Sequence, residues 1–176
     1  MQKRWIVAES ITDEIKNQFP ELDRAVLQLL WNRGIRTQEE IDVYLSPDWS
    51  RDTYGPELFS NMVPAVSRVF DGLERSEVIT VHGDYDADGV CGSTVLVSTL
   101  RDICEKFDYN SELITSYIPH REKEGYGMSV ETIEHLSEHD KTKLVVTVDC
   151  GISNKEAIDR GKELGIDTIV CDHHTM

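Results

Sequence analysis

The fold of this chain is decided by the stretch VITVHGDYDADG, residues 78–89. Its β-branched start, residues 78–81, predicts a buried strand. One histidine and three aspartates then follow at every second position: His82, Asp84, Asp86 and Asp88. Three carboxylates this close repel one another unless they are solvated or neutralised, and a divalent cation neutralises them most fully. We therefore interpret this stretch as one wall of a metal site.

The length and the cysteine pattern limit the class of protein. A chain of 176 residues predicts one domain, or a domain with a small appendage, and can bury a sizeable core without disulfides. The four cysteines show no C-x-x-C spacing, and no signal peptide or membrane-span pattern is present. We expect reduced thiols, a cytoplasmic location and no membrane partner.

The net charge of −15 argues against the broad basic surface that duplex-DNA binders use. It does not exclude nucleic acid, because bound metal ions would reverse the sign locally and let a phosphate approach. We interpret most of the excess charge as an ordinary solvated surface.

The amino-terminal third predicts a small helical segment. Apolar residues between positions 22 and 30 form a helical stripe, and Gly34 stands where a helix would end. Thr37 and Glu40 fit a capping box that begins a second helix. This pair of helices is acidic on its exposed side, so we favour a packing role over DNA reading. Residues 48–62 read as a linker, which places the domain boundary between 1–62 and 63–176.

From residue 78 onward, short apolar runs alternate with helical patterns. Strands are predicted at 78–81, 113–118, 144–148 and 168–171, and helices at 90–104, 129–136 and 154–164. We expect Val95, Leu96, Leu100 and Ile103 to face inward on the first of these helices. This alternation predicts an α/β fold with a parallel sheet and crossover helices.

The polar clusters all follow the ends of these strands. The clusters are His82 to Asp88, the loop at 119–122, Asp149, and the run Asp172, His173 and His174. Because the carboxyl ends of parallel strands share one edge, we expect one site there. Carboxylates with imidazoles favour Mn²⁺ or Mg²⁺, and two ions held close together could clamp a phosphoryl group and supply the nucleophile.

Each cluster also has a simpler interpretation. The run from Asp84 resembles half of a calcium loop, but its twelfth position is Val95, where a glutamate is needed. Asp149 alone could cap the following helix. Cys150 and Cys171 read as small buried residues. In the loop at 117–128, Arg121 could hold a phosphate and Tyr126 could stack on a base or sugar, or this could be an ordinary surface loop.

Taken together, these motifs resemble the DHH phosphoesterase superfamily. The resemblance is carried by H-x-x-x-D-x-D at 82–88, VDCGI at 148–152 and DHH at 172–174. The longer GDYDADG at 83–89, IPHR at 118–121, EGYG at 124–127 and the helical opening are similar to the branch that degrades single-stranded DNA.

The resemblance implies a 5′-to-3′ exonuclease on single-stranded DNA that acts in recombination and repair beside a single-strand-binding protein or a helicase. It implies Mn²⁺ or Mg²⁺, with two ions. The implied metal ligands are His82, Asp86, Asp88, Asp149 and His173. Asp149 would bridge the ions, His174 would face the scissile phosphate or complete the metal site, and Asp172 would orient its neighbours. We assign Arg121, Tyr126, Gly127 and Asp84 to substrate binding.

The sequence stops two residues after the DHH motif, whereas the resemblance implies a fourth metal-binding aspartate and further domains. We therefore expect a truncated domain and weak or absent nuclease activity from these residues alone. Two alternatives stay open. One is another DHH phosphoesterase, acting on oligoribonucleotides, cyclic dinucleotides or pyrophosphate; the other is a non-catalytic scaffold in a repair or replication assembly.

Overall fold

The computed structural model describes residues 4–175. The chain divides into two compact units, with the division between Leu58 and Phe59. The first unit is helical, with α1 (Asp13–Gln18), α2 (Arg24–Asn32), α3 (Gln38–Leu45), α4 (Trp49–Asp52) and the 3₁₀ turn η1 (Pro56–Leu58). Its small core is made of Ile11, Phe19, Leu27, Leu30 and Ile41. The domain boundary at residue 62 stays a prediction.

The capping box of α3 is confirmed. The Glu40 amide donates to Thr37 Oγ1 over 3.2 Å, and the Thr37 amide donates to Glu40 Oε2 over 3.0 Å. The predicted surface linker at 48–62 contains two short helical turns, α4 and η1, and its role as a linker stays a prediction. Asp48 caps the short helix α4 by accepting from the amides of Ser50 and Arg51, which is enough to close one turn.

The second unit alternates helices and strands, as the sequence predicts. Its elements are α5 (Met62–Glu74), β1 (Val78–Gly83), α6 (Ala87–Phe107), η2 (Ser111–Leu113), β2 (Ile114–Tyr117), α7 (Val130–Glu138), β3 (Thr142–Val148), α8 (Lys155–Glu163) and β4 (Asp167–Cys171). All paired strands are parallel and their order is β2-β1-β3-β4. The predicted α/β fold with crossover helices is confirmed.

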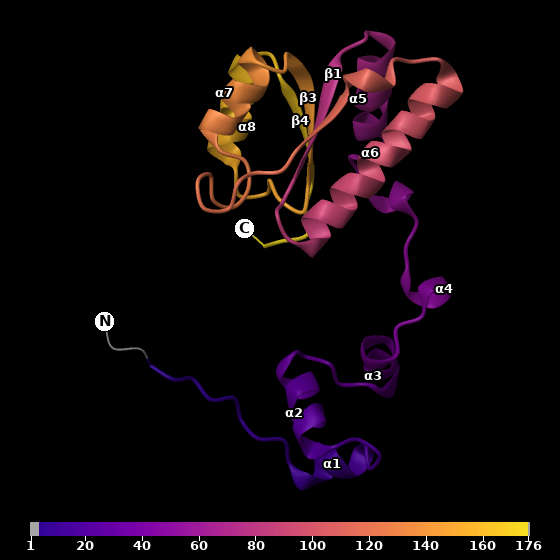
Figure 1. Ribbon diagram of the computed structural model, residues 1–176. Helices are drawn as coiled ribbons and strands as arrows, with labels where there is room; N and C mark the ends of the chain where they lie inside the picture. Colours follow the sequence, from indigo (N-terminus) through magenta and orange to yellow (C-terminus); the bar gives the residue numbers. More distant parts are fainter. Residues whose placement is uncertain (1–3, 176) are drawn as a thin grey trace. The chain divides into compact units, whose positions relative to one another are not determined.

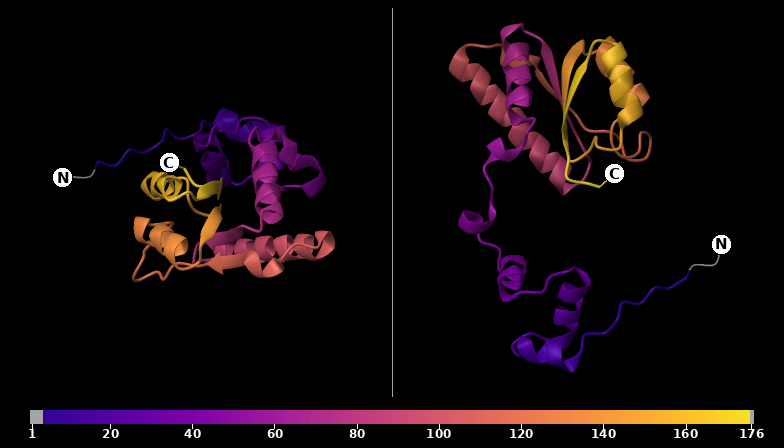
Figure 2. Two further views of the ribbon diagram at one scale, coloured as in Figure 1. Left: turned by 90° about the horizontal axis from the view of Figure 1, so that it is seen from above. Right: turned by 180° about the vertical axis from the view of Figure 1, so that it is seen from behind.

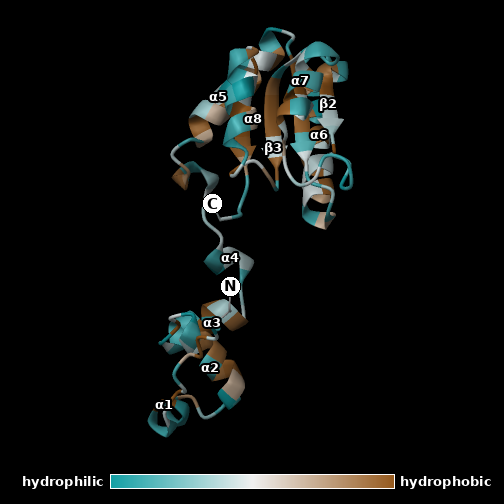
Figure 3. Ribbon diagram, turned by 90° about the vertical axis from the view of Figure 1, so that its left-hand side faces the viewer, coloured by the Kyte–Doolittle hydropathy of each residue, from teal (hydrophilic) through white to brown (hydrophobic). Residues whose placement is uncertain are grey.

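The sheet lies between two layers of helices. Helices α5 and α6 cover one face, and α7 and α8 cover the other (Figures 1 and 2). Alternate residues of each strand point to opposite faces, so Leu144 and Val146 join the core under α5 and α6, whereas Val145 joins the core under α7 and α8. Strand β3 is hydrophobic along most of its length because both of its faces are covered (Figure 3).

Helix α6 differs from its prediction in two ways. It begins at Ala87 because the Asp86 side chain caps it, so the aspartate motif overlaps the first turn of the helix. The inward placement of Val95 is wrong: this side chain is 67% exposed, whereas Leu100 is buried. Position 95 lies well round the helix from the buried positions 93, 100 and 104, on the side away from the sheet.

The strand order creates a switch point. From the central strand β1 the chain passes to β2 on one side, whereas the other neighbour of β1 is β3. In open α/β sheets, a crevice forms beyond the carboxyl ends of two strands whose connections run in opposite directions. The loops after β1 and β3 flank this crevice. Among the described residues, no helix combines the length and the hydropathy needed to cross a membrane.

Candidate metal centre

Two overlapping groups of possible metal ligands lie at the switch point. One contains Asp84, Asp86 and Asp149, and the other contains Asp149, His173 and His174. Within each group, the ligand atoms all lie within 4.8 Å of one another. Asp149 belongs to both groups, so two cations could share its carboxylate. Three of the four predicted strand-end clusters, those after β1, β3 and β4, thus contribute to these groups.

Asp84 carries the strongest sign that a cation belongs here. Its side chain is 3% exposed, and its Oδ1 has no hydrogen-bond partner in the described part of the chain. Burial raises the pKa of Asp84, and the nearby carboxylates of Asp86 and Asp149 raise it further. A buried carboxylate with an unpartnered oxygen is unfavourable unless it is protonated or meets a cation. These oxygen and nitrogen donors suit a divalent cation such as Mn²⁺ or Mg²⁺.

The burial of Asp84 depends on a glycine. The first turn of α6 lies directly on the backbone of Asp84, and a Cβ built on Gly89 would stand 2.5 Å from the Asp84 amide nitrogen and carbonyl oxygen. No side chain larger than hydrogen fits at this position without moving the helix. Gly89 therefore allows α6 to close over the aspartate.

Asp149 is held in an unusual backbone conformation. Its φ is +61°, in the left-handed region that aspartate tolerates better than most residues. The Asp149 amide donates to the Cys171 carbonyl over 2.9 Å, and its Oδ1 lies 2.9 Å from His173 Nε2. This conformation turns the carboxylate toward the loop after β4. The simpler interpretation of Asp149 as a helix cap is wrong, because α8 is preceded by Asn154.

Asp172 and His174 form a pair on the other side of the crevice. Asp172 Oδ1 accepts from His174 Nδ1 over 2.8 Å and from the His174 amide, and its Oδ2 accepts from the Ile152 amide over 3.0 Å. Burial alone would raise the pKa of Asp172, but these hydrogen bonds outweigh it and lower the pKa to about 2. The same hydrogen bond raises the pKa of His174.

The other two predicted ligands stand apart from these groups. Asp88 is exposed on the first turn of α6, and its amide donates to Asp86 Oδ1. His82 is fully buried on the α7 and α8 face of the sheet, stacked on Tyr117 with its Nδ1 3.6 Å from Cys150 Sγ. Burial lowers the pKa of His82 to about 4, so this imidazole is neutral at pH 7. Among the described residues, neither side chain joins a ligand group.

The loop between β2 and α7 brings its predicted residues to the site. Tyr126 Oη donates to the Asp149 carbonyl over 3.0 Å and lies 3.1 Å from His174 Nδ1. Arg121 is exposed, and its guanidinium carbon lies 5.0 Å from the centre of the Tyr85 ring. The sequence analysis missed this contact; adjacency of the loops after β1 and β2 would have been the signal, had the strand order been known.

The prediction of two small buried cysteines is half right. Cys150 is fully buried, and burial raises the pKa of its thiol to about 12. Cys171 is exposed, because it lies at the end of the edge strand β4, where one side of the strand lacks a neighbour within the described sheet.

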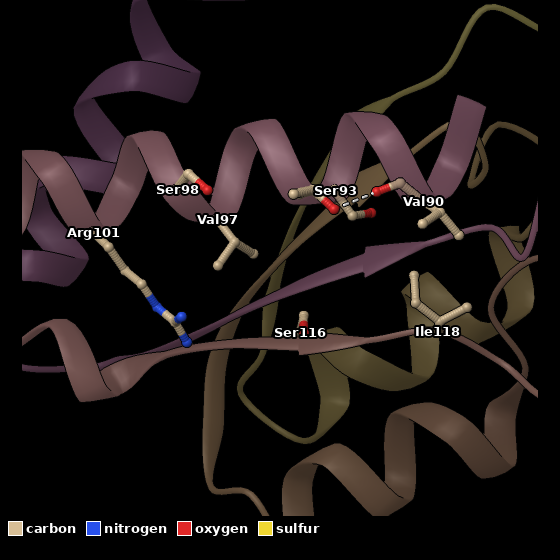
Figure 4. Close-up of a pocket in the computed structure, with 8 residues that line it drawn as sticks. Val90, Ser93, Val97, Ser98, Arg101, Ser116 and Ile118 are labelled. Atoms are coloured by element: carbon tan, nitrogen blue, oxygen red, sulfur yellow. Dashed lines mark hydrogen bonds between the residues drawn. The ribbon is translucent and has the colours of Figure 1, made fainter. Parts of the chain in front are cut away.

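A separate groove of about 240 Å³ lies between α6 and β2 (Figure 4). Apolar side chains and hydroxyls line it, and Arg101 at one end donates to the Ile114 carbonyl over 3.0 Å. None of the predicted site residues lines this groove, so the candidate centre at the strand ends is separate from it.

Comparison with known proteins agrees with this geometry. The model of the DHH family, N-terminal domain, matches residues 78–176, which is more than half of the chain. The single-stranded-DNA-specific exonuclease RecJ of Bacillus subtilis is 34% identical over 173 residues, which cover 97% of this chain and 21% of the relative. RecJ of Thermus thermophilus is 36% identical over 148 residues, covering 82% of this chain and 19% of the relative. The chain thus spans about a fifth of the length of these relatives.

A solved structure supports the same assignment. A crystal structure of exonuclease RecJ bound to manganese is 39% identical, with a TM-score of 0.52, over 64% of this chain and 27% of that one. The fold, the metal-ligand groups at the strand ends and the family match lead to one conclusion. This chain belongs to the DHH family.

Proposed function

We propose that this chain is a divalent-metal-dependent phosphodiesterase that degrades single-stranded DNA from its 5′ end. The observation that carries the proposal is the pair of ligand groups that share Asp149 beside the unpartnered carboxylate of Asp84. The similarity to RecJ supports the substrate class, because RecJ is named as specific for single-stranded DNA.

We propose two Mn²⁺ or Mg²⁺ ions, held by Asp84, Asp86, Asp149 and His173, with exposed Asp88 as a further ligand. When bound, such ions neutralise the carboxylates, polarise the scissile phosphate and lower the pKa of the attacking water. We assign His82 a supporting role instead, because it is buried against Tyr117 and Cys150 and belongs to neither ligand group among the described residues.

The remaining residues would bind and orient the DNA. Asp172 accepts the Nδ1 proton of His174, which leaves Nε2 of this imidazole for the scissile phosphate. Arg121 would pair with a phosphate, and Tyr126 would offer its ring to a base or sugar. Gly127 has a φ of +78° and brings this loop close to Asn154.

The wider role follows from the same similarity. We propose that the protein acts in DNA recombination and repair, with a single-strand-binding protein and a helicase as partners. The four cysteines are all free, which supports a reducing compartment such as the cytoplasm.

The proposal is tested by calorimetric titration with Mn²⁺ and by product analysis. We expect Mn²⁺ to bind the wild type, and Asp149→Ala to weaken binding by more than 100-fold, about 2.7 kcal/mol, because both groups lose a ligand. Asp140→Ala, at an exposed position beyond α7, is the matched control.

We expect hydrolysis by these residues to be weak, and in the presence of Mn²⁺ 5′-phosphorylated single strands should be cleaved in preference to dinucleotides or pyrophosphate. Preferential cleavage of a dinucleotide would assign the chain to another branch of the family. Absence of Mn²⁺ binding by the folded wild type would favour a scaffold.

A further inference from the structure

The loop between β2 and α7 is organised around one carboxylate, that of Glu124. Its Oε2 accepts from Tyr117 Oη of β2 over 2.5 Å and from Thr132 Oγ1 of α7 over 3.3 Å. Its Oε1 accepts from the backbone amide of His120 over 2.7 Å. One side chain therefore joins the end of a strand, the loop that follows it and the first turn of the next helix.

Glu124 also closes the turn that carries Arg121. The Glu124 amide donates to the His120 carbonyl over 2.8 Å, while the His120 amide donates back to the Glu124 carboxylate. Arg121 lies within this ring of reciprocal hydrogen bonds and extends over the Tyr85 ring. The direction of Arg121 is thus set by the turn rather than by an ion pair of its own.

The other limb of the loop is anchored by Asn154. The Met128 amide donates to Asn154 Oδ1 over 3.2 Å, and a Cβ on Gly127 would stand 2.5 Å from that oxygen. Tyr126 lies between this anchor and Glu124, and its hydroxyl reaches the Asp149 carbonyl. The two anchors together fix where Tyr126 can lie.

Glu124 is a charged group held without a cation. No Lys, Arg or His side chain forms an ion pair with it among the described residues. Burial raises its pKa, but the hydrogen bond from Tyr117 and the two others outweigh this and keep the pKa below its usual value. The partly buried carboxylate therefore stays ionised and depends on these three donors.

We propose that Glu124 is the positioning residue that places Arg121 and Tyr126 against single-stranded DNA. Glu124 belongs to neither ligand group among the described residues and acts through the loop that it closes. The inference rests on the proposed function in one respect, because it takes Arg121 and Tyr126 as the groups that meet the DNA.

The test measures binding of a short 5′-phosphorylated oligothymidylate with a 3′ fluorophore, by fluorescence anisotropy, with Ca²⁺ as the only divalent cation. We expect Glu124→Ala to weaken binding about tenfold and Glu124→Gln about threefold, since the amide keeps the shape and one acceptor. Glu122→Ala should stay within about twofold, because Glu122 is exposed and its side chain forms no hydrogen bond in the described structure. Thermal unfolding of each variant identifies any that fails to fold, in which case Glu124→Gln decides.

A double-mutant cycle separates positioning from general stability. In the Arg121→Ala/Tyr126→Ala background, Glu124→Ala should weaken binding by less than about twofold, because the guanidinium and the ring that it positions are gone. A full tenfold further loss in this background would overturn the proposal. So would equal binding by wild type and Glu124→Ala.

A second readout does not depend on DNA. The Tyr126 and His174 rings have centroids 5.7 Å apart, so the His174 Cε1–H signal in NMR reports the position of Tyr126. We expect this signal to shift in Glu124→Ala and to stay in place in Glu122→Ala. If the wild type fails to bind the oligonucleotide but the signal shifts, the proposed function is wrong and the positioning stands. If the signal does not move, the positioning is wrong.

Discussion

The loops after β1 and β4 each bury an aspartate, but only one of these carboxylates is satisfied by the protein. Asp172 after β4 accepts three hydrogen bonds, two from His174 and one from Ile152, and its pKa falls to about 2. Asp84 after β1 has an oxygen without a partner, and burial raises its pKa. The loop after β4 is complete by itself, whereas the loop after β1 is complete only with a cation.

This difference indicates that the two carboxylates have different roles, one in positioning a side chain and the other in binding a cation. A carboxylate that is fully bonded within the protein keeps one geometry, and so it can hold His174 in place before any ligand arrives. A carboxylate that is buried but unpartnered destabilises the metal-free protein and strengthens the binding of a cation. Asp149 lies between the two loops and is the residue that both ligand groups share.

The largest effect is expected from a substitution of Asp84, in the loop after β1. Asp84→Asn removes a charged ligand, and we expect calorimetry to show Mn²⁺ affinity lower by on the order of 100-fold, about 2.7 kcal/mol. The metal-free variant should be more stable than the wild type at pH 7 by about 1 kcal/mol, because the buried charge is gone. Asp102→Asn, an exposed aspartate on α6, is the control for both measurements.

The pH dependence of stability tests the same residue, because the raised pKa of Asp84 predicts the direction in which the free energy of unfolding changes with pH. The folded-state pKa of Asp84 is raised, so the metal-free wild type should lose stability as the pH rises above the unfolded pKa of about 3.9. Urea unfolding of Asp84→Asn should lack this component. Unchanged Mn²⁺ affinity together with unchanged stability would remove Asp84 from the centre.

A smaller effect is expected on the β4 side. Asp172→Asn keeps the shape but loses the charge that accepts from His174, and we expect a loss of about 2 kcal/mol in the free energy of unfolding at pH 7. The folded pKa is lowered, so this stability should be present above pH 4 and be lost as the pH falls toward 2.

Urea unfolding of the wild type and of Asp172→Asn across this pH range measures the effect. Asp71→Asn, at an exposed position on α5, is the control. If the wild type and Asp172→Asn differed equally at pH 7 and at pH 2, the ionised carboxylate would not be the source of the stability. A difference that appears only after Mn²⁺ is added would reverse the contrast between the two loops.

The sequence was sufficient for the parts of the molecule that depend on local pattern. Alternating strands and helices predicted the parallel sheet, and the sheet alone placed Asp86, Asp149 and His173 at one edge. Strand periodicity also indicates that His82 is buried in the sheet, because residues 80 and 82 share a face and Thr80 is buried on that same face.

What could not be predicted depends on packing between distant segments. Asp84 is central because α6 closes over it at Gly89, and nothing near position 84 indicates this burial. Cys171 is exposed because β4 is an edge strand, which follows from the strand order. The three donors that Glu124 gathers come from β2, the loop and α7, so its role was not visible in the motif.

The smallest expected effect concerns the contact between the two sides. Tyr126→Phe removes only the hydroxyl that donates to the Asp149 carbonyl, and we expect the free energy of unfolding to fall by about 1 kcal/mol. Tyr54→Phe, at a tyrosine that is 82% exposed in the first unit, should change it by less than about 0.5 kcal/mol. Because the hydroxyl contacts the backbone carbonyl of Asp149 and His174 Nδ1, and not the Asp149 carboxylate, Mn²⁺ affinity should stay within about twofold of the wild type. A large loss of Mn²⁺ affinity would mean that Tyr126 holds Asp149 in its left-handed conformation, which would make the metal centre dependent on the loop.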